Sequence, residues 1–190
     1  MELKKPETFE ELLELQRVLD ENTGKARQNG FIPRKRNIDD IRLSLIAELI
    51  EFNEELPQTH KTWKQKSFNK ENAIIESIDV LFFFLQFINH LKDKKTDGIE
   101  RVIKNCDFNK IKFFSDNKDF YSEELDSFSI ICIIFDLLEG SINGFFSKLC
   151  RMYSSLKLTK EDVFNVYWEK WQKNMKRVSE DWTLQEVSKW

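Results

Sequence analysis

The chain has 190 residues, 41% of them hydrophobic and 33% charged, which is enough for one domain with its own core and short of what two domains need. Five glycines and three prolines are few for this length, which disfavours all-β folds and glycine-rich phosphate loops. The 30 basic and 33 acidic residues give a net charge of −3, without the broad positive field that draws proteins to nucleic acids. We expect a single all-α domain over residues 1–190 that does not bind nucleic acid and meets any phosphate ligand with local cations.

The cysteine content and the N-terminal segment indicate a cytoplasmic protein. The three cysteines include no Cys-x-x-Cys pair, which argues against a disulfide framework and against thiolate zinc. The N-terminal segment is a charged amphipathic helix by pattern and lacks the apolar centre of a signal peptide. The longest apolar run, residues 80–91, is interrupted by Gln86 and Asn89 and is shorter than the roughly 20 residues of a membrane span. We therefore expect a buried helix there and no membrane association.

Capping residues and apolar periodicity predict the helices in chain order. Thr8 and Glu11 form a capping-box pattern ahead of a helix over 9–21, and a loop over 22–37 follows. The apolar period resumes at Ile41 and ends near residue 56. A connecting loop is predicted over 58–69, followed by a mostly buried helix over 70–91 and by loops and short helices over 92–122. Two helical segments over 123–139 and 142–156 meet at Gly140. A last helix, capped by Thr159 and Asp162, reaches about residue 178.

Two pairs of acidic residues three positions apart are the first candidates for chemistry. Glu48 and Glu51 would share one helix face and could share a ligand, although such a pair is more often a solvated surface. Glu76 and Asp79 are more informative because they are the only charges in the apolar stretch 73–89. Two carboxylates buried on one helix face repel each other unless a cation or a basic group compensates them.

The nature of that compensation is open from spacing alone. A salt bridge to a lysine or arginine would explain the second pair, and Asp136 with Glu139 is a similar pair elsewhere in the chain. If both pairs face each other on antiparallel helices, they supply four oxygen ligands, which suit Mg²⁺ or Mn²⁺ better than zinc. Redox iron is disfavoured because neither His60 nor His90 lies in a Glu-x-x-His pattern.

The last predicted helix carries the complementary charge. Lys170, Asn174 and Arg177 follow one another at helical spacing, with Tyr167 one turn earlier. Such a stripe can bind phosphate oxygens, and it can equally be a solvated basic surface.

Taken in order, these segments resemble the dimeric all-α dUTPases of the MazG-like nucleoside-triphosphate pyrophosphohydrolase superfamily, over most of the chain. The resembling pieces are Leu15-Gln16 with Asp20, the pair Glu48 and Glu51, the segment Lys61-Thr62-Trp63-Lys64, the pair Glu76 and Asp79, and the series Tyr167, Lys170, Asn174, Arg177 followed by Trp182.

The resemblance implies a helical bundle that works as a homodimer on a deoxynucleoside triphosphate. It implies hydrolysis of dUTP to dUMP and pyrophosphate with Mg²⁺, or Mn²⁺ in its place. The implied metal ligands are Glu48, Glu51, Glu76 and Asp79, with Glu48 or Glu51 orienting the attacking water. The implied phosphate-binding residues are Lys170, Arg177 and Lys64, and the implied nucleotide-binding residues are Gln16, Asp20, Asn22, Trp63 and Asn174.

The sequence departs from this family at Asp20, where relatives usually carry asparagine. An ionised carboxylate only accepts hydrogen bonds, whereas an amide also donates them, so base selectivity can differ. One alternative is therefore the same chemistry on dCTP or on several deoxynucleoside triphosphates. A second alternative is a helical binding protein without a reaction, in which the carboxylates are neutralised by salt bridges.

Overall fold

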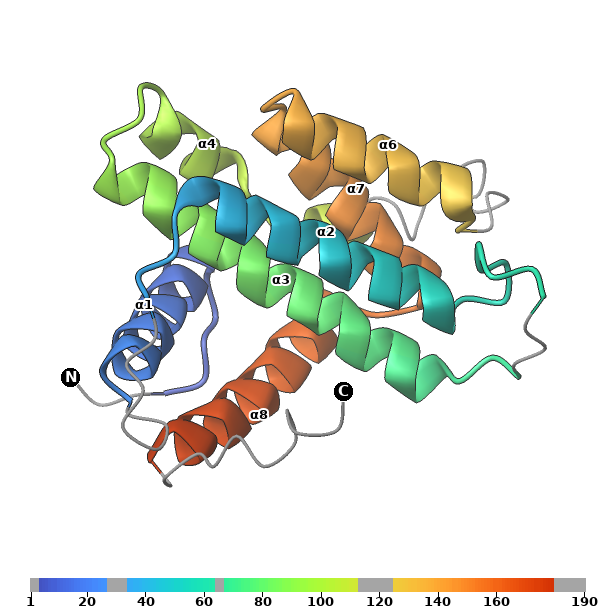
Figure 1. The fold of residues 1–190 in the computed structure, drawn as a ribbon, viewed down its shortest axis with the longest axis horizontal. Helices are drawn as coiled ribbons and strands as arrows, with labels where there is room; N and C mark the ends of the chain where they lie inside the picture. The colour runs from blue at the N-terminus through green and yellow to red at the C-terminus, as the bar shows by residue number, and fades with distance from the viewer. Residues whose placement is uncertain (1–3, 27–33, 64–66, 113–124, 180–190) are drawn as a thin grey trace.

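The computed structural model describes residues 4–26, 34–63, 67–112 and 125–179, which form α-helices and no strand (Figure 1). The all-α prediction is therefore confirmed. The helices are α1 (Phe9–Lys25), α2 (Ile38–Glu55), α3 (Lys70–Asp93), α4 (Ile99–Asn105), α6 (Ser127–Leu138), α7 (Ile142–Ser155) and α8 (Lys160–Ser179).

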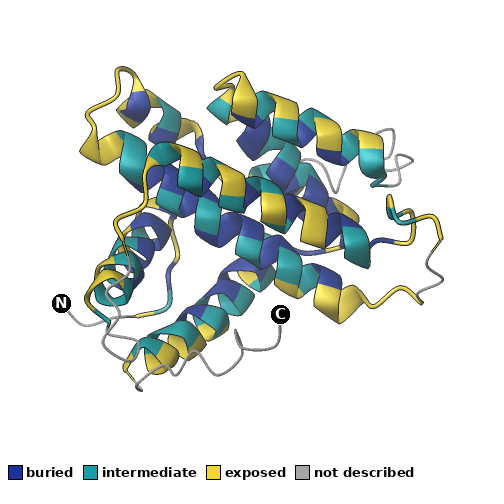
Figure 2. Ribbon diagram, viewed as in Figure 1, coloured by how far each residue is buried: buried dark blue, intermediate teal, exposed yellow. Residues whose placement is uncertain are grey.

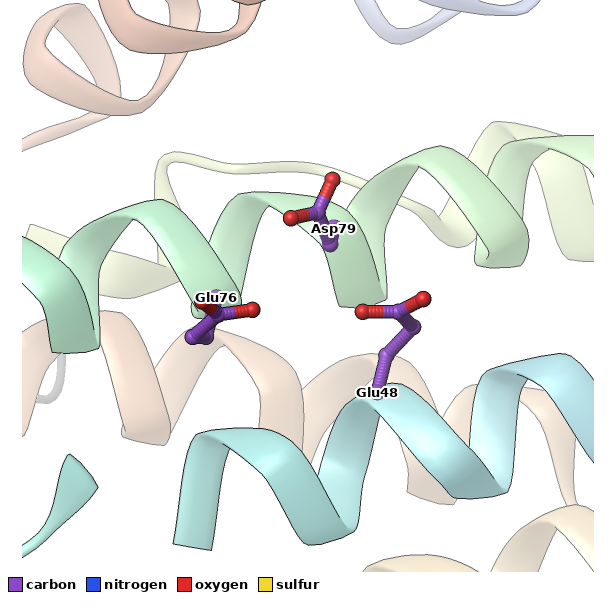
Figure 3. Close-up of side chains that lie close together, drawn as sticks. All are labelled: Glu48, Glu76 and Asp79. Atoms are coloured by element: carbon purple, nitrogen blue, oxygen red, sulfur yellow. The ribbon is translucent and has the colours of Figure 1, made fainter. Parts of the chain in front are cut away.

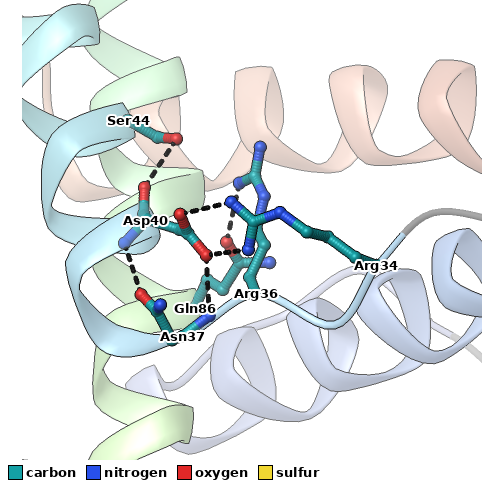
Figure 4. Close-up of polar contacts among 6 residues, drawn as sticks. All are labelled: Arg34, Arg36, Asn37, Asp40, Ser44 and Gln86. Atoms are coloured by element: carbon teal, nitrogen blue, oxygen red, sulfur yellow. Dashed lines mark hydrogen bonds and ion pairs between the residues drawn. The ribbon is translucent and has the colours of Figure 1, made fainter.

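The chain begins α1 and α2 with reciprocal caps. Thr8 and Glu11 form the predicted capping box of α1, and Asn37 and Asp40 form a second one on α2. In Figure 4, Arg34 donates two hydrogen bonds to the Asp40 carboxylate, at 2.5 and 2.7 Å. The guanidinium of Arg34 lowers the pKa of Asp40 to about 2. This bidentate pair ties the chain ahead of α2 to the first turn of that helix.

Helix α3 runs through the middle of the molecule, with α2 antiparallel beside it (Figure 1). Helix α6 packs against α2, α7 packs against α6 and stacks Phe145 on Phe84 of α3, and α1 and α8 also pack against α3. Aromatic rings fill the centre, where Phe9 contacts Phe84, Phe108 and Phe146 at centroid distances of 5.7 to 6.3 Å. This core accounts for a good part of the high phenylalanine content.

Helix α3 is the one described helix that is long and apolar enough, by length and composition, to cross a membrane. Gln86 and Asn89 do not interrupt it, so the argument that the apolar run is too short fails for the 24-residue helix. Inside the fold, 56% of its most apolar stretch is buried, as in the central helix of a globular protein (Figure 2). The predicted burial of this helix is thus confirmed.

Two helix boundaries differ from the predicted ones by four residues. Helix α1 continues to Lys25, four residues beyond the predicted end, and the Asn22 amide donates to the carbonyl oxygen of Val18 at 2.7 Å within it. A side chain that bonds one turn back satisfies itself inside the helix, so this residue does not end it. Helix α6 begins at Ser127 with an Asp126 cap, later than the predicted residue 123. Gly140, at φ +74°, separates α6 from α7 as predicted.

Candidate functional site

Three of the four predicted acidic ligands meet between α2 and α3. Glu48 projects from α2 towards Glu76 and Asp79 of α3 (Figure 3), and one carboxylate oxygen of each lies within 4.8 Å of the others. The antiparallel pairing of these helices brings the two sequence motifs to the same level. All three side chains are partly buried, and no other group of this kind occurs within the described part of the chain.

The surroundings of the three carboxyl groups disfavour their ionised forms. Burial raises the pKa of Glu48 to about 7, and the charges of Asp79, Glu51 and Glu76 add to that effect. Burial also raises the pKa of Glu76 and of Asp79, and Asp79 adds to the effect on Glu76. One lysine opposes these shifts, since the Lys170 ammonium group forms an ion pair with Asp79. A cluster of acids with a single paired cation favours binding of a further positive charge.

Glu51 stands beside this group and not in it. Its side chain is exposed, although its charge contributes to the raised pKa of Glu48 and of Glu76. A spacing of three residues turns a helix by about 300°, so the two glutamates of α2 diverge by about 60°. The structure therefore brings together Glu48, Glu76 and Asp79 and leaves Glu51 at the edge facing solvent.

The basic stripe of α8 approaches the acidic group from the α3 side. Lys170 also donates to the carbonyl oxygen of Ile75, at 3.4 Å, so it lies over the first turn of the acidic segment. The positive charge of Arg177, which is itself exposed, lowers the pKa of Asp79. Asn174 lies between these two residues on α8 and is partly buried. The prediction that α8 presents cations to the site is consistent with this placement.

A second polar group joins α1, α3 and α8. The Asp20 carboxylate accepts from the side-chain amides of Gln16 and Gln86, each at 2.8 Å. Arg36 donates to the amide oxygen of Gln86 at 3.1 Å (Figure 4), and the Tyr167 hydroxyl donates to the amide oxygen of Gln16 at 3.2 Å. Burial raises the pKa of Asp20 to about 6. Gln16 is only 3% exposed, so its amide holds the Asp20 carboxylate from the buried side.

The two polar groups lie on the same face of α3. Asp79, Phe83 and Gln86 follow at helical spacing, and all three are partly exposed. Seven residues of helix separate the first from the last, which is about 10 Å. The Arg36 guanidinium covers the Phe83 ring between them, at 5.0 Å from the ring centroid. A ligand with an anionic end and a polar ring at the other end can therefore span this face.

Sequence reasoning missed Arg36 and Gln86 as members of this group. Gln86 was visible only as a polar interruption of an apolar run, and Arg36 only as one of three consecutive basic residues, 34–36. Gln86 lies 66 positions from Asp20 and 50 positions from Arg36 in sequence, so no local spacing reveals these contacts.

The remaining predicted nucleotide contacts are not gathered here. Asn22 is bonded to its own helix, as described above. Trp63 is 74% exposed in the connection between α2 and α3. Gln86 lies 16 residues beyond the start of α3 at Lys70, which is roughly 24 Å along the helix axis. Lys61, in the same connection, forms an ion pair with Glu54. Lys64 falls outside the described residues, as does Trp182.

The rival acidic pair has a salt bridge. Asp136 forms an ion pair with Lys148 of α7, and Glu139 is exposed at the end of α6. The Asp136 carboxylate lies close to Gly144, because a Cβ added to this glycine would be 2.7 Å from a carboxylate oxygen of Asp136. The salt-bridge interpretation therefore applies to this pair.

A cavity of about 880 Å³ lies elsewhere in the molecule. It is bounded by the segment before α1, residues 108–112, and the start of α8 with the turn that precedes it, and it contains none of the predicted site residues.

The chain matches one known family over most of its length. The family model described as dUTPase matches residues 8–182, which include the acidic group, the polar group of Asp20 and the whole of α8. A comparison with curated proteins found no match.

Proposed function

The chain belongs to the all-α dUTPase family, and we propose that this dUTP diphosphatase works with a divalent metal ion bound by Glu48, Glu76 and Asp79 and cleaves dUTP to dUMP and pyrophosphate. The crowding of three raised-pKa carboxylates beside one lysine is the observation that carries the metal proposal. Because the chain belongs to a family of dUTPases, we do not propose the alternative of a helical binding protein without a reaction.

The acidic group fits a hard divalent cation. It offers oxygen donors only, from partly buried carboxylates whose repulsion a cation would relieve, and Mg²⁺ and Mn²⁺ prefer such ligands. A bound ion would lower the pKa of water and offset the charge of the phosphates. Glu51, exposed beside the group, can turn towards it as a further ligand.

The acidic and basic side chains divide the reaction between them. Glu51 or Glu48 accepts a proton from the attacking water at a carboxylate oxygen, because both are within the field of the other acids and are at least partly open to solvent. Lys170 and Arg177 bind phosphate oxygens from α8, and Lys64 is a third candidate. Asn174, between the two cations of α8, binds phosphate or sugar.

The nucleoside end lies about 10 Å along α3, at the polar group of Asp20. Asp20 is held by two amides and is the member of that group that can meet a base edge. Trp63 and Asn22 stay proposals for base or sugar contact, since Trp63 is largely exposed in the α2–α3 connection and Asn22 bonds its own helix.

One observation leaves a second substrate open. An ionised Asp20 carboxylate cannot donate a hydrogen bond to a carbonyl oxygen of either base, but it can accept one from the N3–H group of uracil or from the amino group of cytosine. Activity on dCTP, or on several deoxynucleoside triphosphates, is therefore the alternative to strict dUTP selectivity.

Pyrophosphate release from dUTP, dCTP, dTTP and UTP, each with and without Mg²⁺, tests the proposal. We expect Mg²⁺-dependent release that is fastest with dUTP and is lost in Glu76→Gln. The matched control is Glu139→Gln, which removes an exposed glutamate of the rival pair and should keep full activity. Release that is independent of Mg²⁺, or that survives in Glu76→Gln, would contradict the metal site. Equal rates with all four nucleotides would remove the selectivity.

A further inference from the structure

Arg36 is held over α3 although it lies at the surface. The residue belongs to the segment before α2 and is exposed. Its guanidinium group donates a hydrogen bond to the amide oxygen of Gln86 at 3.1 Å (Figure 4) and lies 5.0 Å from the centroid of the Phe83 ring. Both partners belong to α3 and lie one helical turn apart. A hydrogen bond and a cation–π contact together give this arginine a defined place above one face of α3.

The Gln86 amide joins Arg36 to Asp20. Its oxygen accepts from Arg36, and its Nε2 atom donates to Oδ1 of Asp20 at 2.8 Å. The negative end of the amide dipole therefore faces the cation, and the positive end faces the carboxylate. A reversed amide would turn its NH₂ group to the guanidinium and its oxygen to the carboxylate, and both contacts would be repulsive. We call these three residues the Arg36–Gln86–Asp20 link.

The hydrogen bonds to Asp20 leave one carboxylate oxygen for a ligand. The amides of Gln16 and Gln86 both donate to Oδ1. Within the described ranges, Oδ2 accepts no hydrogen bond, and the residue is partly exposed. Oδ2 is therefore the atom of this group that can accept from an N–H group of a base.

Three elements bring ionisable groups to Asp20. Burial raises the pKa of its carboxyl group to about 6, and the two amide hydrogen bonds and the charges of Arg36 and Arg17 lower it. Tyr167 approaches from α8, and burial and the charge of Asp20 raise the pKa of its hydroxyl group. Arg17 of α1 forms an ion pair with Asp93 at 2.9 Å. Arg36 differs from Arg17 because it acts on Asp20 both by its charge and through the amide between them.

We propose that Arg36 is a positioning residue for the base of the nucleotide. Through the Gln86 amide it holds Asp20 as an ionised acceptor whose Oδ2 atom meets an N–H group of the base. The inference rests on the proposed placement of the base at Asp20. Without Arg36, the amide can reverse, and its oxygen then favours a protonated Asp20. A protonated carboxyl group donates a hydrogen bond, so it no longer selects a base edge that carries an N–H group.

The KM for dUTP, measured between pH 5 and pH 8 with Mg²⁺, tests this role. In the wild type, we expect KM to rise as Asp20 is protonated below about pH 6. Arg36→Met should move this midpoint to about pH 7, which raises KM about threefold at pH 6.5 and leaves it almost unchanged at pH 8. The kcat should change less than about twofold, because Arg36 acts at the base end. Arg36→Lys keeps the positive charge and should restore most of the wild-type pH dependence.

Arg17→Met is the matched control. It removes the other positive charge that acts on Asp20 and leaves the Arg36–Gln86–Asp20 link intact, so it should move the midpoint less than Arg36→Met does. Gln86→Met breaks the link on the α3 side and should move the midpoint in the same direction as Arg36→Met. Equal effects of Arg17→Met and Arg36→Met would overturn the proposal, because charge alone would explain them. A rise in KM that is the same at pH 6.5 and pH 8 would also overturn it, since Arg36 would then bind the nucleotide directly.

Urea unfolding of the metal-free protein tests the link without a nucleotide. Because the pKa of Asp20 is higher in the folded state, its protonation stabilises the fold fully below the ordinary value of 3.8, and this contribution is lost as the pH rises through about 6. In Arg36→Met the loss extends to about pH 7. The unfolding constant should therefore rise about eightfold more between pH 5 and pH 8 than in the wild type. This excess should vanish when Asp20→Asn is also present.

The two measurements separate the possible failures. Arg36→Met that unfolds with the same pH dependence as the wild type would overturn the link, whether or not the protein hydrolyses dUTP. An excess in unfolding without a change in the pH dependence of KM would overturn the positioning role and leave the reaction untouched. Failure of the proposed reaction would appear instead as no pyrophosphate release from dUTP by the wild type.

Discussion

Glu48→Gln is expected to stabilise the metal-free protein at pH 8 and to leave it unchanged near pH 4. The folded state raises the pKa of Glu48 from 4.5 to about 7. Because the folded pKa is the higher one, the contribution of Glu48 to the free energy of unfolding is fully present below about pH 4.5. That contribution is lost as the pH rises through 7. Glutamine resembles the protonated side chain and removes this loss.

The size of the effect follows from the shift. A change from 4.5 to about 7 corresponds to an upper limit of about 3 kcal/mol. Glu48 is partly open to water, so screening reduces the expected gain to about 1–2 kcal/mol. For a chain of this length, that gain raises the melting temperature by about 3–6 °C.

Thermal unfolding of the metal-free protein, followed by circular dichroism at pH 4 and pH 8, measures this difference. Glu14→Gln, at an exposed position of α1, is the matched control and should change neither curve by more than about 1 °C. Adding Mg²⁺ at pH 8 should raise the melting temperature of the wild type and raise that of Glu48→Gln less, since a ligand of the native state stabilises it. A variant that is less stable than the wild type at pH 8 without metal would refute the repulsion argument.

Two further substitutions separate the acidic group from the polar group of Asp20. Lys170→Met removes the ion-pair partner of Asp79, so the metal-free protein should lose about 1 kcal/mol at pH 8 in urea unfolding, and Mg²⁺ should restore part of it. An unchanged urea midpoint would argue against that ion pair. Asp20→Asn removes a carboxyl group whose pKa is raised to about 6, so the KM for dUTP should depend on pH around 6 in the wild type and lose that dependence in the variant. A pH dependence that persists in the variant would belong to another group.

Local sequence signals predicted the helices well where a cap marks them. The capping pair Thr8 and Glu11 fixes the start of α1, and Thr159 and Asp162 bond each other at the start of α8 as predicted. The end of α1 was predicted too early, because the predicted loop began at Asn22. In the folded protein its side chain bonds the preceding turn, an outcome that residue type alone does not determine.

Site residues were predictable only to the extent that their partners are local. The pair Glu76 and Asp79 was conspicuous because no other charge interrupts its apolar helix. The contacts of Gln86 with α1 and with the segment before α2 depend on how the helices pack, and the sequence contains no repeat or spacing that encodes them.

The acidic pairs of α3 and α6 show why spacing alone leaves the outcome open. Asp79 and Asp136 each lie three residues from a glutamate on an apolar helix, and each forms an ion pair with one lysine. The difference comes from the neighbouring helix. Helix α2 brings Glu48 close to Asp79, so one lysine lies beside three carboxyl groups. Lys148 of α7, by contrast, forms an ion pair with Asp136, which has no third carboxyl group beside it among the described residues. Excess negative charge, and with it the proposed affinity for a divalent cation, therefore arises from the packing of α2 on α3 and not from either pair by itself.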